Sequence, residues 1–106
     1  MKDKESLAEG KSVTISLRGN SMFPIIRSGQ AVVIEPCSIR DLRIGDIVYC
    51  NVNRRDFLHK VVGVTDRGDK VLIGNNKGYI NGWTDQVFGK ANLNHKETTN
   101  GGSVAR

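Results

Sequence analysis

The sequence lacks the features that mark several large classes of protein. Among its 106 residues, no apolar run approaches the ~18 residues needed to cross a bilayer. The first residues, MKDKESLAEGKS, are charged from the second position and contain no apolar segment like that of a signal peptide. We therefore expect one small domain without a membrane span, located in the cytoplasm.

Cysteine is also scarce. Cys37 and Cys50 are the only two cysteines, and they are too few and too far apart for a zinc site or a CxxC redox motif. The sequence therefore predicts no metal, no cofactor and two reduced thiols. Cys50 lies in the apolar run IVYC, which is typical of a small core residue.

The chain has more basic than acidic residues, but the basic residues do not cluster in the sequence. Lys and Arg together number 16 against 11 for Asp and Glu, a net charge of +5. The basic residues are scattered, without a run of five or more and without a DNA-binding motif. Nucleic acid is therefore an unlikely partner, although a basic barrel with Tyr79 and Trp83 as stacking aromatics remains an alternative.

Short alternating or β-branched runs follow one another at a spacing of roughly ten residues, with turn residues between them. The spacing predicts an all-β fold, a small sandwich or a partly closed barrel. The expected strands are residues 12–17, 31–35, 46–52, 57–65, 70–73 and 87–91.

The remaining segments are expected to be irregular. Residues 1–11 are polar and predict a flexible or weakly helical lead-in to a core spanning residues 12–92. Residues 74–84 are rich in Gly and Asn and predict a loop. Residues 93–106 have almost nothing to bury and predict a disordered tail.

Two residues could carry nucleophilic chemistry. Ser21 follows a strand in the turn sequence GNSMFP, where most serines are structural. His59 lies in a half-apolar strand, where most histidines are packed residues, but its ordinary pKa of ~6.5 suits a general base. A serine becomes a nucleophile only with a base within hydrogen-bond reach.

The order of several separated motifs adds to the evidence that Ser21 and His59 give. GNSMFP, SGQAVVI, IGDIV, LHKVV, GNN and FGKA follow one another between about Val13 and Ala91. In this order and near this spacing they resemble the serine peptidases of the S24/S26 group, which includes the type I signal peptidases and the self-cleaving SOS-type repressors.

The resemblance implies roles for particular residues. Ser21 matches the nucleophile, and its backbone N–H would help form the oxyanion hole. His59 matches the general base. In bacterial members of the group this base is Lys. In other signal peptidases it is His followed by a basic residue, a place that Lys60 fills here. Gly45-Asp46 and Gly89 match structural positions of the group.

Two departures from the group's pattern bear on activity. The Gly-Asp-Asn motif reads Gly74-Asn75-Asn76, so its acid is replaced by an amide. Either Asp85 or Asn75 could orient the imidazole of His59. At Gly19, signal peptidases often carry a Ser that helps bind the oxyanion.

The resemblance implies a soluble serine endopeptidase that cleaves an extended polypeptide in trans. No Ala-Gly dipeptide precedes the expected core, so self-cleavage is not expected. The alternative is a catalytically inactive module that uses the same β-fold for binding or assembly. The oligomeric state and the cleavage specificity do not follow from the sequence.

Overall fold

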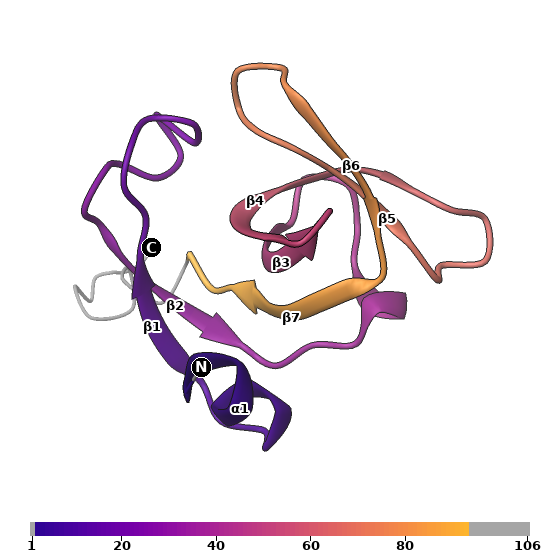
Figure 1. The fold of residues 1–106 in the computed structure, drawn as a ribbon, viewed down its shortest axis with the longest axis horizontal. Helices are drawn as coiled ribbons and strands as arrows, with labels where there is room; N and C mark the ends of the chain where they lie inside the picture. The colour runs from indigo at the N-terminus through magenta and orange to yellow at the C-terminus, as the bar shows by residue number, and fades with distance from the viewer. Residues whose placement is uncertain (1, 94–106) are drawn as a thin grey trace, which may run out of the picture.

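A computed structural model describes residues 2–93 of the chain as one curled, seven-stranded antiparallel sheet with a single short α-helix (Figure 1). This confirms the predicted all-β fold and favours the partly closed barrel over the sandwich. Apart from its first residue, the predicted tail lies outside the described residues. The elements are α1 (Lys2–Ala8), β1 (Val13–Ser16), β2 (Ala31–Glu35), a 3-10 turn η1 (Ile39–Asp41), β3 (Ile47–Val52), β4 (Arg55–Val64), β5 (Val71–Gly74), β6 (Ile80–Thr84) and β7 (Gln86–Ala91).

The strand order across the sheet is β1-β2-β7-β3-β4-β5-β6. β4 is the longest strand and pairs with β3 from Arg55 to Lys60, whereas its pairing with β5 begins only at Lys60. Residues 55–59 therefore have an unpaired edge on the side opposite β3. β1 pairs only with β2, so within residues 2–93 the sheet presents a second free edge there.

Two apolar clusters fill the curl of the sheet. The first gathers the helix, the turns after β1 and the strands β2, β3, β4 and β7; the second lies between β3, β4 and β5. Cys50 belongs to the second cluster, as predicted, and burial raises the pKa of its thiol to about 12. Gly89 is needed where β7 passes β2, because a Cβ there would lie 2.6 Å from a methyl group of Ile34.

The N-terminal residues are helical, one of the two alternatives expected from the sequence, rather than flexible. Lys2–Ala8 form helix α1, and Leu7 is buried in the first cluster with 3% of its surface exposed. One apolar side chain in a polar segment gives no helical periodicity to detect, yet it attaches the helix to the sheet. Within residues 2–93, no helix is both long enough and apolar enough to span a membrane.

The predicted loop at residues 74–84 is also partly wrong. Its second half forms β6, which pairs with β5 through Ile73–Gly82 and Leu72–Trp83. The register shifts next to Gly74, and Gly82 adopts a φ of +137°, so the glycines that suggested a loop are accommodated inside a hairpin. This strand carries a residue of the candidate site.

Candidate active site

The structure brings Ser21 and His59 together, although 38 positions separate them in the sequence. Ser21 lies in the turns that follow β1, and His59 lies in β4. The Oγ atom of Ser21 is 3.2 Å from Nε2 of His59, within hydrogen-bond distance. We call these two residues the Ser–His pair.

The imidazole of His59 is held on two sides. Nδ1 is 2.8 Å from Oδ1 of Asn81, and the ring stacks on Phe57 with the centroids 4.8 Å apart. An amide oxygen can only accept a hydrogen bond, so Nδ1 carries the proton and Nε2 faces Ser21 as an acceptor. Only 6% of the residue is exposed. Burial lowers the pKa of His59, and the hydrogen bond to Asn81 partly opposes that shift.

The turn that carries Ser21 is fixed from a distant part of the chain. The backbone N–H of Asn76 donates to the carbonyl of Ser21 at 2.9 Å, and its side-chain amide donates to the carbonyl of Phe23, also at 2.9 Å. The ammonium group of Lys60 donates to Oδ1 of Asn76 at 3.0 Å. Asn76 therefore links the turn that carries Ser21 to the strand that carries His59. Figure 1 shows the β5–β6 loop reaching towards that turn.

Below this turn, two side chains reach into the first apolar cluster. Met22 and Ile26 are completely buried, and the N–H of Ile26 donates to the carbonyl of Met22 at 2.9 Å. They fix the turn to the core, while Ser21 stays partly accessible. Because Pro24 lies between them, the segment forms successive turns rather than a helix, as the sequence predicts.

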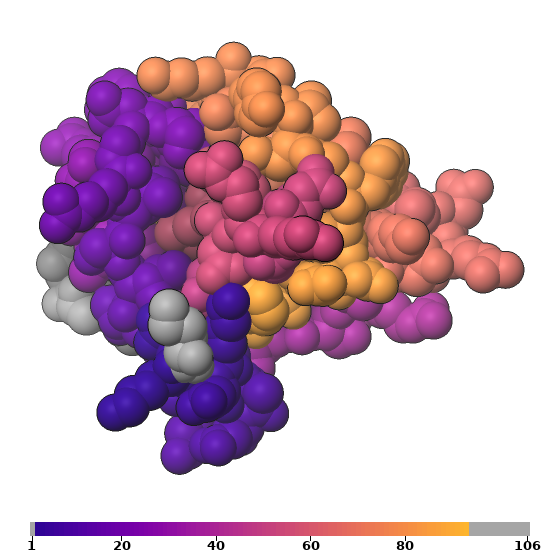
Figure 2. All heavy atoms as spheres, viewed as in Figure 1, coloured from indigo at the N-terminus to yellow at the C-terminus, as the bar shows by residue number. Residues whose placement is uncertain are grey.

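A cleft of about 320 Å³ opens beside the Ser–His pair. It runs between the end of β1 and the first half of β4, the two segments with unpaired edges. In Figure 2 the purple N-terminal segment and the pink β3–β4 hairpin lie side by side on the face towards the viewer. The lining residues are Ile15, Ser16, Leu17, Arg18, Ser21, Tyr49, Asp56, Phe57, Leu58 and His59.

Asp85 or Asn75 was expected from the sequence to orient the imidazole of His59, but neither residue hydrogen-bonds to the ring. Asn75 caps the β5–β6 turn, where its side chain accepts from the N–H groups of Lys77 and Tyr79. Asp85 lies between β6 and β7 and lines a separate depression with Trp83. Asn81 holds the ring instead.

Sequence reasoning missed Asn81 because it treated residues 74–84 as a loop. Alternation along a β5–β6 hairpin would not have revealed it either, because the register shift leaves Asn81 between the pairs Ile73–Gly82 and Gly74–Ile80.

Gly19 has a structural reason to be a glycine. Its φ is +93°, a conformation that other residues rarely adopt, and its N–H donates to Oγ of Ser28 at 3.0 Å. The backbone N–H of Ser21, by contrast, donates to no group within residues 2–93. Over the same part of the chain, no three His, Cys, Asp or Glu side chains gather in an arrangement that could hold a metal ion.

The comparison with protein families agrees with the motifs. The model of the Peptidase S24-like family matches residues 2–88. The chain belongs to this family. The match begins at the first residue of helix α1. No individual curated protein matches the chain.

Proposed function

We propose that this Peptidase S24-like domain is a serine endopeptidase in which Ser21 is the nucleophile and His59 the general base. The observation that carries the proposal is the distance of 3.2 Å between Ser21 Oγ and His59 Nε2, with Nδ1 of the same ring bonded to Asn81. A nucleophile, a base within reach and a third group that orients the base make up the arrangement used in acyl transfer.

In the proposed reaction, Ser21 Oγ attacks the carbonyl carbon of a peptide bond and its proton passes to His59 Nε2. The tetrahedral intermediate then breaks the C–N bond, and His59 returns the proton to the leaving amine. Water next attacks the acyl carbon and gives a proton to His59. The bond between the acyl carbon and Ser21 Oγ then breaks, His59 returns its proton to Oγ, and the carboxyl product leaves. Through its bond to Nδ1, Asn81 keeps Nε2 directed at Ser21.

The negative charge of the intermediate needs hydrogen-bond donors placed in advance. The N–H of Ser21 donates to no group within the described chain, so it is available to the oxyanion. Gly19 offers no hydroxyl for this purpose, and its N–H is already bonded to Ser28. The proposed oxyanion hole therefore relies on the backbone.

The cleft supports an extended peptide as the substrate. The free edge of β1 and the free edge of residues 55–59 in β4 both line it, and their unpaired backbone groups can form a strand ladder with an added peptide. Such pairing would place a peptide carbonyl beside Ser21. The pockets that receive the peptide side chains would then determine which sequences are cleaved.

The test is cleavage of internally quenched, strand-forming peptides by the wild type and four variants. Ser21→Ala and His59→Ala are expected to abolish cleavage, since each removes one member of the Ser–His pair. Ser38→Ala, at an exposed serine without a capping bond, and His95→Ala, at the other histidine, are matched controls. Cleavage that survives both Ser21→Ala and His59→Ala would overturn the proposal.

The second candidate is a domain that binds peptides without cleaving them. It is favoured by one feature, the neutral amide of Asn81 where peptidase triads often carry a carboxylate that stabilises the imidazolium. A peptide that binds the wild type and Ser21→Ala with equal affinity, and is never cut, would support this candidate.

A further inference from the structure

The lining of the cleft includes a carboxylate, that of Asp56, which the proposed mechanism does not use. Residues alternate along β4, so Asp56 shares a face with the buried Leu58, and Tyr49 lies opposite Leu58 on β3. The apolar walls of Ile15 and Leu17 complete this part of the cleft. A substrate side chain that reaches this face of β4 from the free edge would therefore pass over apolar groups before it met Asp56.

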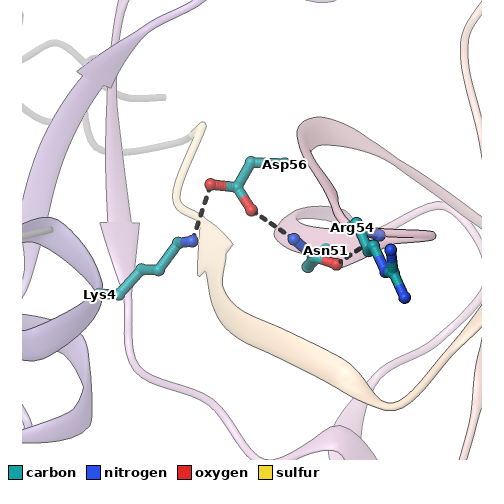
Figure 3. Close-up of polar contacts among 4 residues, drawn as sticks. All are labelled: Lys4, Asn51, Arg54 and Asp56. Carbon is teal, nitrogen blue, oxygen red and sulfur yellow. Dashed lines mark hydrogen bonds and ion pairs between the residues drawn. The ribbon is translucent and has the colours of Figure 1, made fainter.

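The Asp56 carboxylate is held in one orientation by two donors (Figure 3). Lys4 Nζ is 2.8 Å from Oδ2, and the side-chain amide of Asn51 donates to Oδ1, also at 2.8 Å. Asn51 is fixed in turn, because its Oδ1 accepts from the N–H of Arg54 at 3.1 Å. Burial alone would raise the pKa of Asp56, but the hydrogen bonds from Lys4 and Asn51 outweigh it and lower the pKa. The carboxylate is thus ionised at neutral pH.

This carboxylate can accept further hydrogen bonds. Two carboxylate oxygens offer about four acceptor positions, and Lys4 and Asn51 fill two of them. The side chains of Asp56 and Lys4 are 34% and 31% exposed, so the ion pair is within reach of solvent and of a ligand. An ion pair this exposed is weak enough for another cation to join it or displace it.

Lys4 comes from outside the cleft rather than from its lining. It belongs to helix α1, which Leu7 attaches to the core, and its ammonium also lies 4.8 Å from the centroid of the Phe88 ring. The helix therefore keeps a cation beside Asp56 when the cleft is empty.

We propose that Asp56 selects a substrate with a Lys or Arg side chain, and that Lys4 competes for the same carboxylate. This inference rests on the proposed peptidase function. The aliphatic part of the basic side chain would lie against Leu17 and Tyr49, while its charged end reaches Asp56. Asp56 is three residues from His59 along β4, about 10 Å at ~3.3 Å per residue. The selected side chain is therefore about three positions from the scissile bond.

The test uses pairs of internally quenched peptides that differ only in one residue, lysine or norleucine, scanned along the sequence. Norleucine keeps the aliphatic chain and lacks the charge. We expect the wild type to favour lysine about fivefold in kcat/KM at one position, as for a partly exposed ion pair. Lys4→Met should increase this preference, whereas Asp56→Asn should abolish it. Lys2→Met, on the same helix, and Asp66→Asn, in an exposed turn, are matched controls.

The outcomes separate this inference from the proposed function. Cleavage with equal rates for lysine and norleucine at every position, in both the wild type and Lys4→Met, overturns the inference and leaves the peptidase proposal standing. A preference that survives in Asp56→Asn also overturns it.

Binding provides the second measurement. Fluorescence polarisation with Ser21→Ala and the same labelled peptides should show the lysine preference without cleavage. If the wild type cuts none of the peptides but Ser21→Ala binds the lysine peptide more tightly, the peptidase proposal fails and recognition by Asp56 stands. If no peptide binds, both fail. Because Lys4→Met and Asp56→Asn are expected to act in opposite directions, a general loss of folding cannot imitate the result.

Discussion

The two members of the Ser–His pair are positioned by different parts of the fold. His59 is part of a strand, and its backbone is fixed by the β3–β4 ladder, in which it lies opposite Val48. Its ring has neighbours on β4 and β6, namely Phe57 and Asn81. His59 is therefore placed by regular pairing and by residues on its own and a neighbouring strand.

Ser21 has no strand ladder to hold it. Its turn depends on the buried Met22 and Ile26 below it and on hydrogen bonds from Asn76, which is more than 50 positions away in the sequence. The difference means that the serine and the histidine should respond to different substitutions. Damage to the turn should move Ser21 while leaving His59 in place, and damage around β6 should do the reverse.

The largest effect is expected from Met22→Ala, which removes a completely buried side chain from beneath Ser21. A loss of about 2–5 kcal/mol in the free energy of unfolding follows from the cavity and the lost burial. Urea denaturation measures it. Met22→Leu, which nearly conserves volume, should cost less than about 1.5 kcal/mol. Equal stability of the alanine variant and the wild type would mean that the turn does not depend on this contact.

Asn81→Ala tests how the fold positions His59. It leaves Nδ1 of His59 without a partner and frees the ring to change tautomer. A buried polar group left unpaired costs about 1–3 kcal/mol, and the same free energy in the transition state would lower kcat/KM roughly 5- to 150-fold. Steady-state peptide cleavage measures it. If kcat/KM stays within twofold of the wild type, Asn81 does not position the base.

Asn76→Ala should have a smaller effect, because only the side-chain bonds to Phe23 and Lys60 are lost. The backbone bond from residue 76 to Ser21 can still form. We expect about 0.5 kcal/mol per lost hydrogen bond, and so about 1 kcal/mol for the two, because solvent can reach them; the effect should be seen as a lower kcat with little change in the pH profile. Lys60→Met, which removes only the second bond, is the control. A shift in the pH profile of Asn76→Ala would show that the turn and the imidazole are coupled.

The smallest effect concerns pH. Neutral His59 is the form that can accept a proton, and burial lowers its pKa, so the neutral form persists below the ordinary value of 6.5. The acid limb of the pH profile of kcat/KM should therefore have its midpoint below pH 6.5. In Asn81→Asp, a carboxylate beside the ring favours the imidazolium, and the midpoint should move to higher pH. A wild-type midpoint above pH 6.5 would contradict the dominant role of burial.

The difference between regular strands and irregular turns also explains which elements could be predicted from the sequence. Strands β1, β2, β3, β5 and β7 follow from alternating or β-branched runs between turn residues, and β4 was expected to start two residues later than it does. β6 could not be recognised, since the run INGWT contains Asn and Gly and becomes a strand only through its pairing with β5. Helix α1 depends on one buried side chain, Leu7, which leaves no periodic pattern.

For the site, the motifs identified Ser21 and His59 as candidates, but no local pattern could bring them within hydrogen-bond distance. That distance depends on how the turn after β1 meets β4, which is a property of the curled sheet. Asn81 and Asn76 were missed as partners for the same reason. Both act across the sheet through side-chain amides, and an amide in a Gly- and Asn-rich segment looks like an ordinary turn residue.

The chemistry of the two thiols has a practical consequence. Burial raises the pKa of Cys50 to about 12 and also raises the pKa of the half-buried Cys37, so neither is an appreciable thiolate at neutral pH. Alkylating reagents should therefore react slowly with the natural chain. A single cysteine introduced at the rim of the cleft could then carry a fluorophore, and peptide binding could be followed without removing either native cysteine.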